Sequence, residues 1–305
     1  MRRWTKGCLI FAAIIFAVGI GCLLVAFGMG VSSQQAKSTV EKYVNYFDFF
    51  GVFQDSDWLD DLDSMSDIDD IDDIKEYFNN NHGNDMDEAD VYEYPVSDVD
   101  SLEIEFKKGD VRILPAETED KITVKVDKAS VSRFKENCKN KTLELEYTTS
   151  RTNKHTAGVE IYLPQGVQWK KVELQLGAGT IDIQNPAGLY ADSMELEIGG
   201  GVLYADYIQG KKLDVELGAG QMELDYVNME NIDIEAAAGE AKVCLAGTKE
   251  LYQSEIEVAA GEVKYGDETY SGLVNERKNR PKDAVKKISV QCAAGEVNIT
   301  FKEEI

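Results

Sequence analysis

Histidine, cysteine, proline and positively charged residues are all scarce in this sequence. The 305 residues include 2 His, 5 Cys and 5 Pro, and 32 Lys and Arg stand against 56 Asp and Glu. Zinc sites and cysteine–histidine catalytic pairs need clusters of those two residue types, so neither is expected. The formal charge of −24 also argues against nucleic-acid binding, which needs clustered Lys and Arg to contact phosphates.

An uncharged apolar run lies close to the N-terminus. Residues 8–31 contain no charged side chain, and Arg2, Arg3 and Lys6 precede them. A bilayer core of about 30 Å needs about 20 apolar helical residues, and the bases before the run keep its start in the cytoplasm. We therefore predict a cytoplasmic tail at 1–7, a single transmembrane helix at 8–31 and an extracytoplasmic remainder anchored in the cell membrane. A cleaved signal peptide stays open as the alternative, although its apolar core is normally shorter.

The predicted linker, residues 32–95, is first aromatic and then strongly acidic. Six of the eleven residues at 43–53 are aromatic, and 55–90 holds 15 acids but one base, Lys75. Apolar residues from Leu62 to Phe78 recur every three or four positions, which predicts a short helix with a narrow apolar stripe. The Asp-rich run lacks the Gly and Glu that an EF-hand loop requires, so we interpret it as a solvated spacer.

The rest of the chain, residues 96–305, repeats one short motif around a glycine. Alternating, mostly apolar residues stand seven, five and three positions before this glycine, and again two and four positions after it. Period-two alternation predicts strands with one buried face. The copies are spaced 70, 22, 19, 19, 22 and 34 residues apart, and their glycines are Gly109, Gly179, Gly201, Gly220, Gly239, Gly261 and Gly295.

The spacing within each copy predicts a corner at the glycine. Positions three before and two after it are five residues apart, so strict alternation would turn the second strand's apolar side chains outward. The small residues between the strands must reset the phase with a tight corner or bulge. Units of about 20 residues cannot bury their own faces, so they should stack in parallel as a single-chain, all-β β-solenoid (β-helix). An antiparallel sandwich is the rival architecture.

Several units resemble a known bacterial domain family. The segments VELQLGAGTIDI, LDVELGAGQMEL and ISVQCAAGEVNITF, with VEIYLPQGV ahead of the first, are similar to the "putative adhesin" family of β-strand-repeat domains. The resemblance covers about residues 95–305. It implies a β-repeat fold and a cell-surface role, and it provides no catalytic residues to transfer.

Outward positions of the repeats are mostly acidic. Six and four positions before each glycine stand the pairs Glu103/Glu105, Glu173/Gln175, Glu195/Glu197, Asp214/Glu216, Asp233/Glu235, Glu255/Glu257 and Ser289/Gln291. In a stacked solenoid they form two columns of carboxylates about 5 Å apart. Calcium or a basic partner could offset their repulsion. We expect screening by water, salt and nearby Lys instead, and so predict no metal and no cofactor.

A basic segment interrupts the acidic repeats near the C-terminus. Six bases crowd the last long gap between glycines, which predicts an extruded loop: Arg277, Lys278, Arg280, Lys282, Lys286 and Lys287. Such a loop could bind anionic wall polymers, lipid headgroups or the acidic linker of the same chain. An ordinary solvated loop is the preferred interpretation, and a binding loop is the alternative.

The acids follow the repeat, whereas catalysis needs one unit to differ chemically from the others. His155, near Arg151 and Lys154, is the one local candidate for such a difference, and an exposed loop explains it equally well. We therefore predict no enzyme. The preferred hypothesis is a membrane-anchored surface module that binds a wall polymer or host matrix, or has a structural role in the envelope. The alternative is the exported sensing part of an envelope-stress or regulatory system. With about seven cytoplasmic residues, it would need a membrane protein partner.

Overall fold

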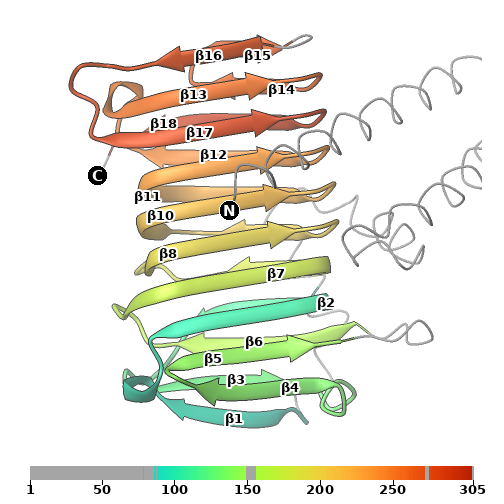
Figure 1. Ribbon diagram of the computed structural model, residues 1–305. Coiled ribbons are helices and arrows are strands. Elements are labelled where there is room, and N and C mark those ends of the chain that lie inside the picture. The colour runs from blue at the N-terminus through green and yellow to red at the C-terminus, as the bar shows by residue number, and fades with distance from the viewer. Residues whose placement is uncertain (1–77, 79–85, 87, 149–155, 272–274, 304–305) are drawn as a thin grey trace, which may run out of the picture.

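The protein's structure is a computed structural model that describes residues 78, 86, 88–148, 156–271 and 275–303 (Figure 1). Two short 3₁₀ helices, η2 (Val96–Asp98) and η3 (Lys249–Leu251), accompany the strands. The strands are β1 (Asp90–Pro95), β2 (Ser101–Pro115), β3 (Lys121–Val126), β4 (Phe134–Lys139), β5 (Thr142–Tyr147), β6 (Ala157–Leu163), β7 (Gln168–Ile183), β8 (Leu189–Ile198), β9 (Val202–Ala205), β10 (Ile208–Leu217), β11 (Gln221–Ala236), β12 (Glu240–Ala246), β13 (Tyr252–Val258), β14 (Glu262–Tyr265), β15 (Glu268–Ser271), β16 (Asn275–Asn279), β17 (Lys286–Cys292) and β18 (Glu296–Lys302).

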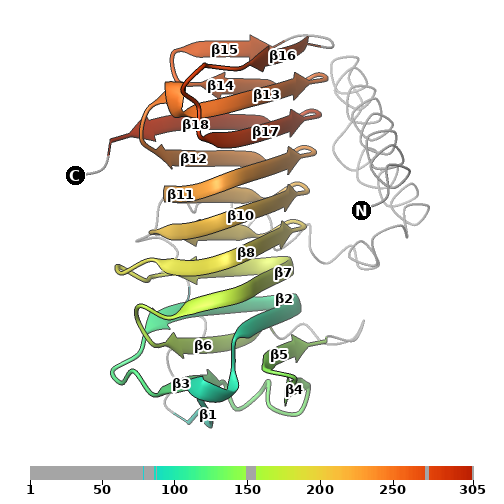
Figure 2. The same cartoon turned by 60° about the vertical axis from the view of Figure 1, so that its left-hand side comes forward.

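These strands form two facing sheets, joined along the stack by corners and by the long strands β2, β7 and β11 (Figures 1 and 2). The first sheet has the order β4–β5–β2–β7–β8–β10–β11–β17–β13–β16. The second has the order β1–β3–β6–β2–β7–β9–β11–β12–β18–β14–β15. Neighbours from β5 to β13 and from β6 to β14 are parallel, which confirms the β-solenoid over the antiparallel sandwich.

The alternating residues of the repeat form the core between the sheets. At the five apolar positions of every copy, the side chain is at most 6% exposed. Leu176 and Ile181, three before and two after Gly179, are both buried, so the corner resets the phase as the spacing predicted. Each rung, one strand from each sheet joined at a corner, therefore buries aliphatic side chains from both of its strands.

The last rung lies out of chain order. β17 and β18 fit between β11/β12 and β13/β14, pairing in parallel with both neighbours in each sheet. Figure 1 shows the red β17 between the paler β11 and β13. Nothing in the spacing of the repeats predicted this insertion, because adjacent copies have nearly the same apolar pattern.

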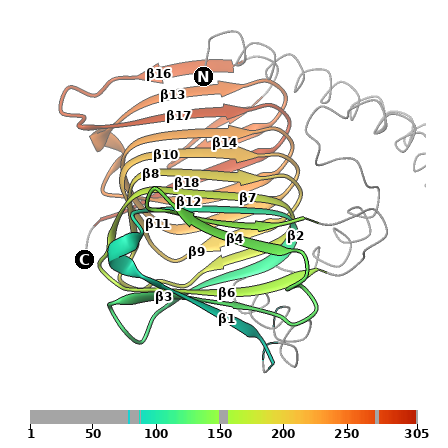
Figure 3. The same ribbon diagram turned by 60° about the horizontal axis from the view of Figure 1, so that its bottom comes forward.

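Antiparallel strands close both ends of the stack. At one end, β15 pairs antiparallel with β14, and β16 with β13. At the other end, β4 pairs antiparallel with β5, β3 with β6 and β1 with β3 (Figure 3). β16 carries Glu276, Arg277 and Lys278, and charged residues on an edge strand discourage further strand pairing. β1 begins at Asp90 and pairs with β3, so the solenoid starts before the boundary predicted at residue 96.

Most of the predicted N-terminal regions, 1–7, 8–31 and 32–95, lies outside the described residues. Within the part that the structure describes, no helix has the length and apolarity to cross a bilayer. Phe78, the last residue of the predicted stripe, is described, helical and 1% exposed. The Arg112 guanidinium lies 5.2 Å from the centre of its ring, so Phe78 packs on the second sheet at β2.

Candidate functional site

The seven corner glycines form one column along the stack. Each lies against the backbone of the next in the order Gly109, Gly179, Gly201, Gly220, Gly239, Gly295 and Gly261. A methyl group at Gly220 would lie 2.2 Å from the carbonyl oxygen of Gly201. This close approach leaves no room for a side chain, so the glycine column has a structural role.

The outer surface of the first sheet, here called the carboxylate face, brings the outward acids together. Cross-strand register aligns them in two columns: Glu144, Glu103, Glu173, Glu195, Asp214, Asp233, Ser289 and Glu255, and beside it Glu146, Glu105, Gln175, Glu197, Glu216, Glu235, Gln291 and Glu257. Neighbouring strands in such a sheet are about 4.8 Å apart. The face therefore presents a dense, regular array of negative charge.

Two half-buried carboxylates in the second column have raised pKa values. Burial raises the pKa of Glu197, and the charges of Glu195, Glu173 and Glu105 raise it further. Burial, followed by the charge of Glu197, likewise raises the pKa of Glu216. Repulsion between these groups is thus only partly screened, and a cationic or hydroxyl-bearing partner would relieve it.

A third row lies beside the two columns, and our sequence analysis missed it. Eight positions before each corner glycine stand Ser101, Lys171, Ser193, Lys212, Asn231, Gln253 and Lys287. Lys171 pairs with Glu173 and lies 3.6 Å from Glu195, and Lys212 pairs with Asp214. The same alternation that revealed the acids would have revealed this row, had the pattern been followed two residues further.

The structure corrects the predicted extruded basic loop. Arg277 and Lys278 lie in β16, and Lys286 and Lys287 begin β17, so only Arg280 and Lys282 lie between strands. The Lys286 ammonium is 2.7 Å from Asn228 Oδ1 and covers the Tyr252 ring at 5.5 Å. These contacts form because β17 is inserted between β11 and β13 and β16 pairs with β13 at the end of the stack, so most of the segment belongs to the sheet.

Three of these bases line a depression on the carboxylate face. It has a volume of about 530 Å³ and lies over β10, β11, β17, β13 and β16, with Lys278, Arg280 and Lys287 in its lining. Ser289 of β17 stands in the first column between Asp233 and Glu255. Its short side chain leaves space where the neighbouring strands carry carboxylates, and this explains the hollow.

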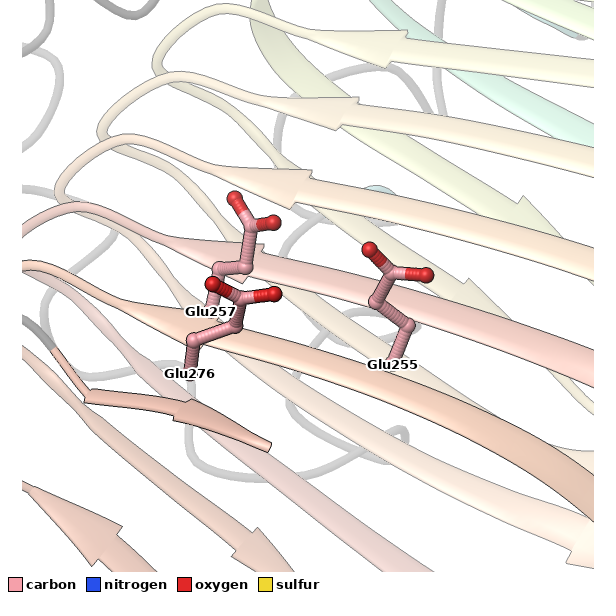
Figure 4. Close-up of side chains that lie close together, drawn as sticks. All are labelled: Glu255, Glu257 and Glu276. Atoms are coloured by element: carbon pink, nitrogen blue, oxygen red, sulfur yellow. The ribbon is translucent and has the colours of Figure 1, made fainter. Parts of the chain in front are cut away.

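Three glutamates, of which Glu255 lines this depression, lie close together (Figure 4). Carboxylate oxygens of Glu255 and Glu257 on β13 and Glu276 on β16 lie within 4.8 Å of one another. Such a group could hold a cation, but Lys278 Nζ already lies 2.8 Å from Glu276 and 2.9 Å from Glu255. Hydrogen bonds that the Lys278 ammonium donates to Glu276 and Glu255 raise the pKa of Lys278, so the ammonium stays charged and offsets the charge of the two carboxylates.

The catalytic candidate His155 lies outside the described residues, as do Arg151 and Lys154. Along the described columns, every carboxylate except Glu255 lies beside another carboxylate on a neighbouring strand. The arrangement is suited to repeated contacts with an extended, polar partner.

Comparison with known proteins places the solenoid in a family. No curated protein matches the chain. Among solved structures, a "putative cell adhesion protein" from Clostridium sporogenes is 19% identical, covering 70% of this chain and 100% of its own, with a TM-score of 0.39. A "putative adhesin" from Bacteroides fragilis is 14% identical, with coverages of 70% and 97% and a TM-score of 0.38. A "putative lipid binding protein" from Parabacteroides distasonis is 13% identical, with coverages of 69% and 96% and a TM-score of 0.33.

The model of the family described as Toastrack DUF4097 matches residues 99–304, which include almost the whole solenoid from β2 to β18. The predicted "putative adhesin" β-repeat domain is thereby confirmed at the level of the family. The chain belongs to the Toastrack DUF4097 family.

Proposed function

We propose that this protein is a membrane-anchored, extracytoplasmic binding module that holds an envelope polymer or matrix partner on its carboxylate face, without catalysing a reaction. One observation carries the proposal: two aligned columns of acids extend across the parallel strands from β5 to β13. A regular array of equivalent groups fits a partner with repeated ammonium or hydroxyl groups better than a single small reactant.

The anchor is the apolar run at residues 8–31, preceded by Arg2, Arg3 and Lys6. It would hold the solenoid outside the cytoplasm, with the acidic region 55–90 as a spacer between bilayer and stack. We expect the full chain to stay with membranes after an alkaline carbonate wash. Its release into the soluble fraction would overturn the anchor.

Crosslinking in intact cells tests the binding face. A C-terminally tagged full chain is crosslinked, purified, and assayed for attached wall polymer, matrix and membrane proteins. The test variant carries Glu195→Gln, Asp214→Asn and Asp233→Asn on the carboxylate face. A matched control carries Glu223→Gln, Glu240→Gln and Glu262→Gln on the second sheet, so both variants lose the same charge.

We expect the face variant to retain much less polymer or matrix than the control. Equal retention by the two variants would overturn the carboxylate face as the binding surface. Recovery of a stoichiometric membrane protein in place of polymer or matrix would contradict the proposal and favour an exported sensing domain that acts through that partner.

A further inference from the structure

The depression over β17 combines hydrogen-bond donors with the acid columns. Five donor-bearing residues line it in register from strand to strand: Lys212, Asn231, Lys287, Gln253 and, after the end of β16, Arg280. Asp214, Asp233 and Glu255 of the first column line it beside them. Donor and acceptor rows therefore run side by side across the same hollow.

Two of the three cations among these five donors have no protein counter-charge. Lys212 pairs with Asp214, and nearby Lys278 pairs with Glu255 and Glu276. Neither Arg280 nor Lys287 makes an ion pair or a side-chain hydrogen bond with another residue, in the part of the chain that the structure describes. Two unpaired cations in one depression are unusual on a face where acids dominate, and they mark a position for an anionic group.

The spacing of the strands lets these two cations share one anion. Lys287 on β17 lies beside Gln253 on β13, and Arg280 follows Asn279, which pairs with Ser254 on the same strand. Lys287 and Arg280 thus flank β13, with backbones separated by about two strand spacings, or roughly 10 Å. Side chains of this length can converge on one phosphate or carboxylate, with the Gln253 amide as a further donor between them.

The surrounding acids determine what else the ligand must carry. A pure polyanion would be repelled by Asp214, Asp233 and Glu255, whereas an ammonium group would be attracted to them. The lining residues include no aromatic side chain on which a sugar ring could stack. The apolar ones, Val215, Ile232 and Ile288, are at most 3% exposed, so they belong to the core and offer no anchor for an apolar side chain.

We propose that this depression binds a flexible, zwitterionic polyol-phosphate chain, with its phosphate between Lys287 and Arg280 and its ammonium groups among Asp214, Asp233 and Glu255, where they would share Asp214 with Lys212 and Glu255 with Lys278. The proposal rests on the proposed function, because it names the ligand class and the position of one subsite on the carboxylate face. The ligand's two charges match the two rows, whereas a neutral glycan would leave Lys287 and Arg280 without a counter-charge.

Calorimetric titration of the full chain in non-ionic detergent tests the proposal. The zwitterionic probe is a glycerol phosphate oligomer that carries alanyl esters. The same oligomer without alanyl groups, a chitosan oligomer and a malto-oligosaccharide serve as polyanionic, polycationic and neutral probes. The test variant is Arg280→Ala/Lys287→Ala. The matched control is Lys282→Ala/Lys139→Ala, which removes two exposed bases that do not line the depression.

We expect the zwitterionic probe to bind most tightly and the test variant to weaken it about tenfold, with less than about twofold change in the control. Equal binding of the plain oligomer, absence of binding by the zwitterionic probe, or equal losses in both variants would overturn the subsite. The cell crosslinking experiment distinguishes this failure from that of the proposed function. A test variant that keeps its envelope partner while probe binding fails would leave the carboxylate face intact and the subsite wrong.

Discussion

Individual glycines determine how closely neighbouring rungs approach. Gly220→Ala would place a methyl group 2.2 Å from the Gly201 carbonyl oxygen, and relief requires the backbone of two rungs to move apart. We expect a loss of about 2 kcal/mol or more in the free energy of unfolding, measured by urea denaturation. Gly166→Asn is the control, because Gly166 has a φ of +73°, which Asn tolerates, and no atom lies within 4 Å of the added Cβ. An equal loss in the control would contradict the role of the column.

Individual carboxylates make stability depend on pH. Burial and neighbouring acids raise the pKa values of Glu197 and Glu216 in the folded state, so the folded chain binds protons more tightly than the unfolded chain. Their contribution to the free energy of unfolding is therefore largest in acid, below the pKa of the unfolded state. It is lost as pH rises through the raised pKa of the folded state. Glu197→Gln and Glu216→Gln should each stabilise the protein at neutral pH by about 0.5 kcal/mol and flatten this dependence in thermal melts. A neutral-pH loss of stability would contradict this account.

Alternation along the sequence predicted which residues are buried, because strand geometry has a fixed period of two. The five apolar positions of each copy, the phase reset at the corner and the acid columns all followed from it. The depression did not follow, because it depends on Ser289 lying between Asp233 and Glu255 on strands that are distant in the chain. Such neighbours are set by the order of rungs, which the local pattern does not contain.

At the scale of elements, the inserted rung β17/β18 joins the last rungs to the stack. β13 and β14 contact β11 and β12 chiefly through it, so the C-terminal segment must add before the stack is continuous. The order of the copies along the chain could not predict this topology, because the apolar pattern of the last copy fits equally well beside any other copy. The rung is buried, so its stability is sensitive to substitutions in its core: Val290 of β17 is 0% exposed.

The insertion predicts cooperative loss of the end of the stack. Val290→Ala should cost about 2 kcal/mol, and native-state hydrogen exchange should show lower protection in β13–β16 as well as in β17 and β18. β2 and β7 should keep more of their protection, because solenoid rungs interact chiefly with their neighbours. Val285→Ala, at a position 77% exposed just before β17, is the control and should leave exchange unchanged. Unaltered protection of β13 in Val290→Ala would show that it does not depend on the inserted rung.

At the scale of the whole molecule, the repulsion within an excess of acids must be offset or screened. The sequence carries 56 Asp and Glu against 32 Lys and Arg, and the carboxylate face concentrates part of that excess on one surface. Lysines such as Lys171 and Lys242, each close to two glutamates, offset it locally on both sheets. Diffuse screening by salt should do the rest, since exposed charges further apart than the Debye length barely interact.

The melting temperature of the whole solenoid should depend on ionic strength and not on a particular divalent cation. Raising sodium chloride from about 0.05 M to about 0.5 M should raise the melting temperature, because the Debye length shortens to a few ångströms and repulsion across the face declines. Millimolar calcium at matched ionic strength should add nothing beyond that shift, and magnesium should behave identically. Glu255→Gln/Glu257→Gln/Glu276→Gln provides the control, because it removes the one cluster of described carboxylates close enough to hold a cation. A calcium-specific rise that disappears in this variant would show that those glutamates bind calcium despite Lys278, and that screening alone does not stabilise the face.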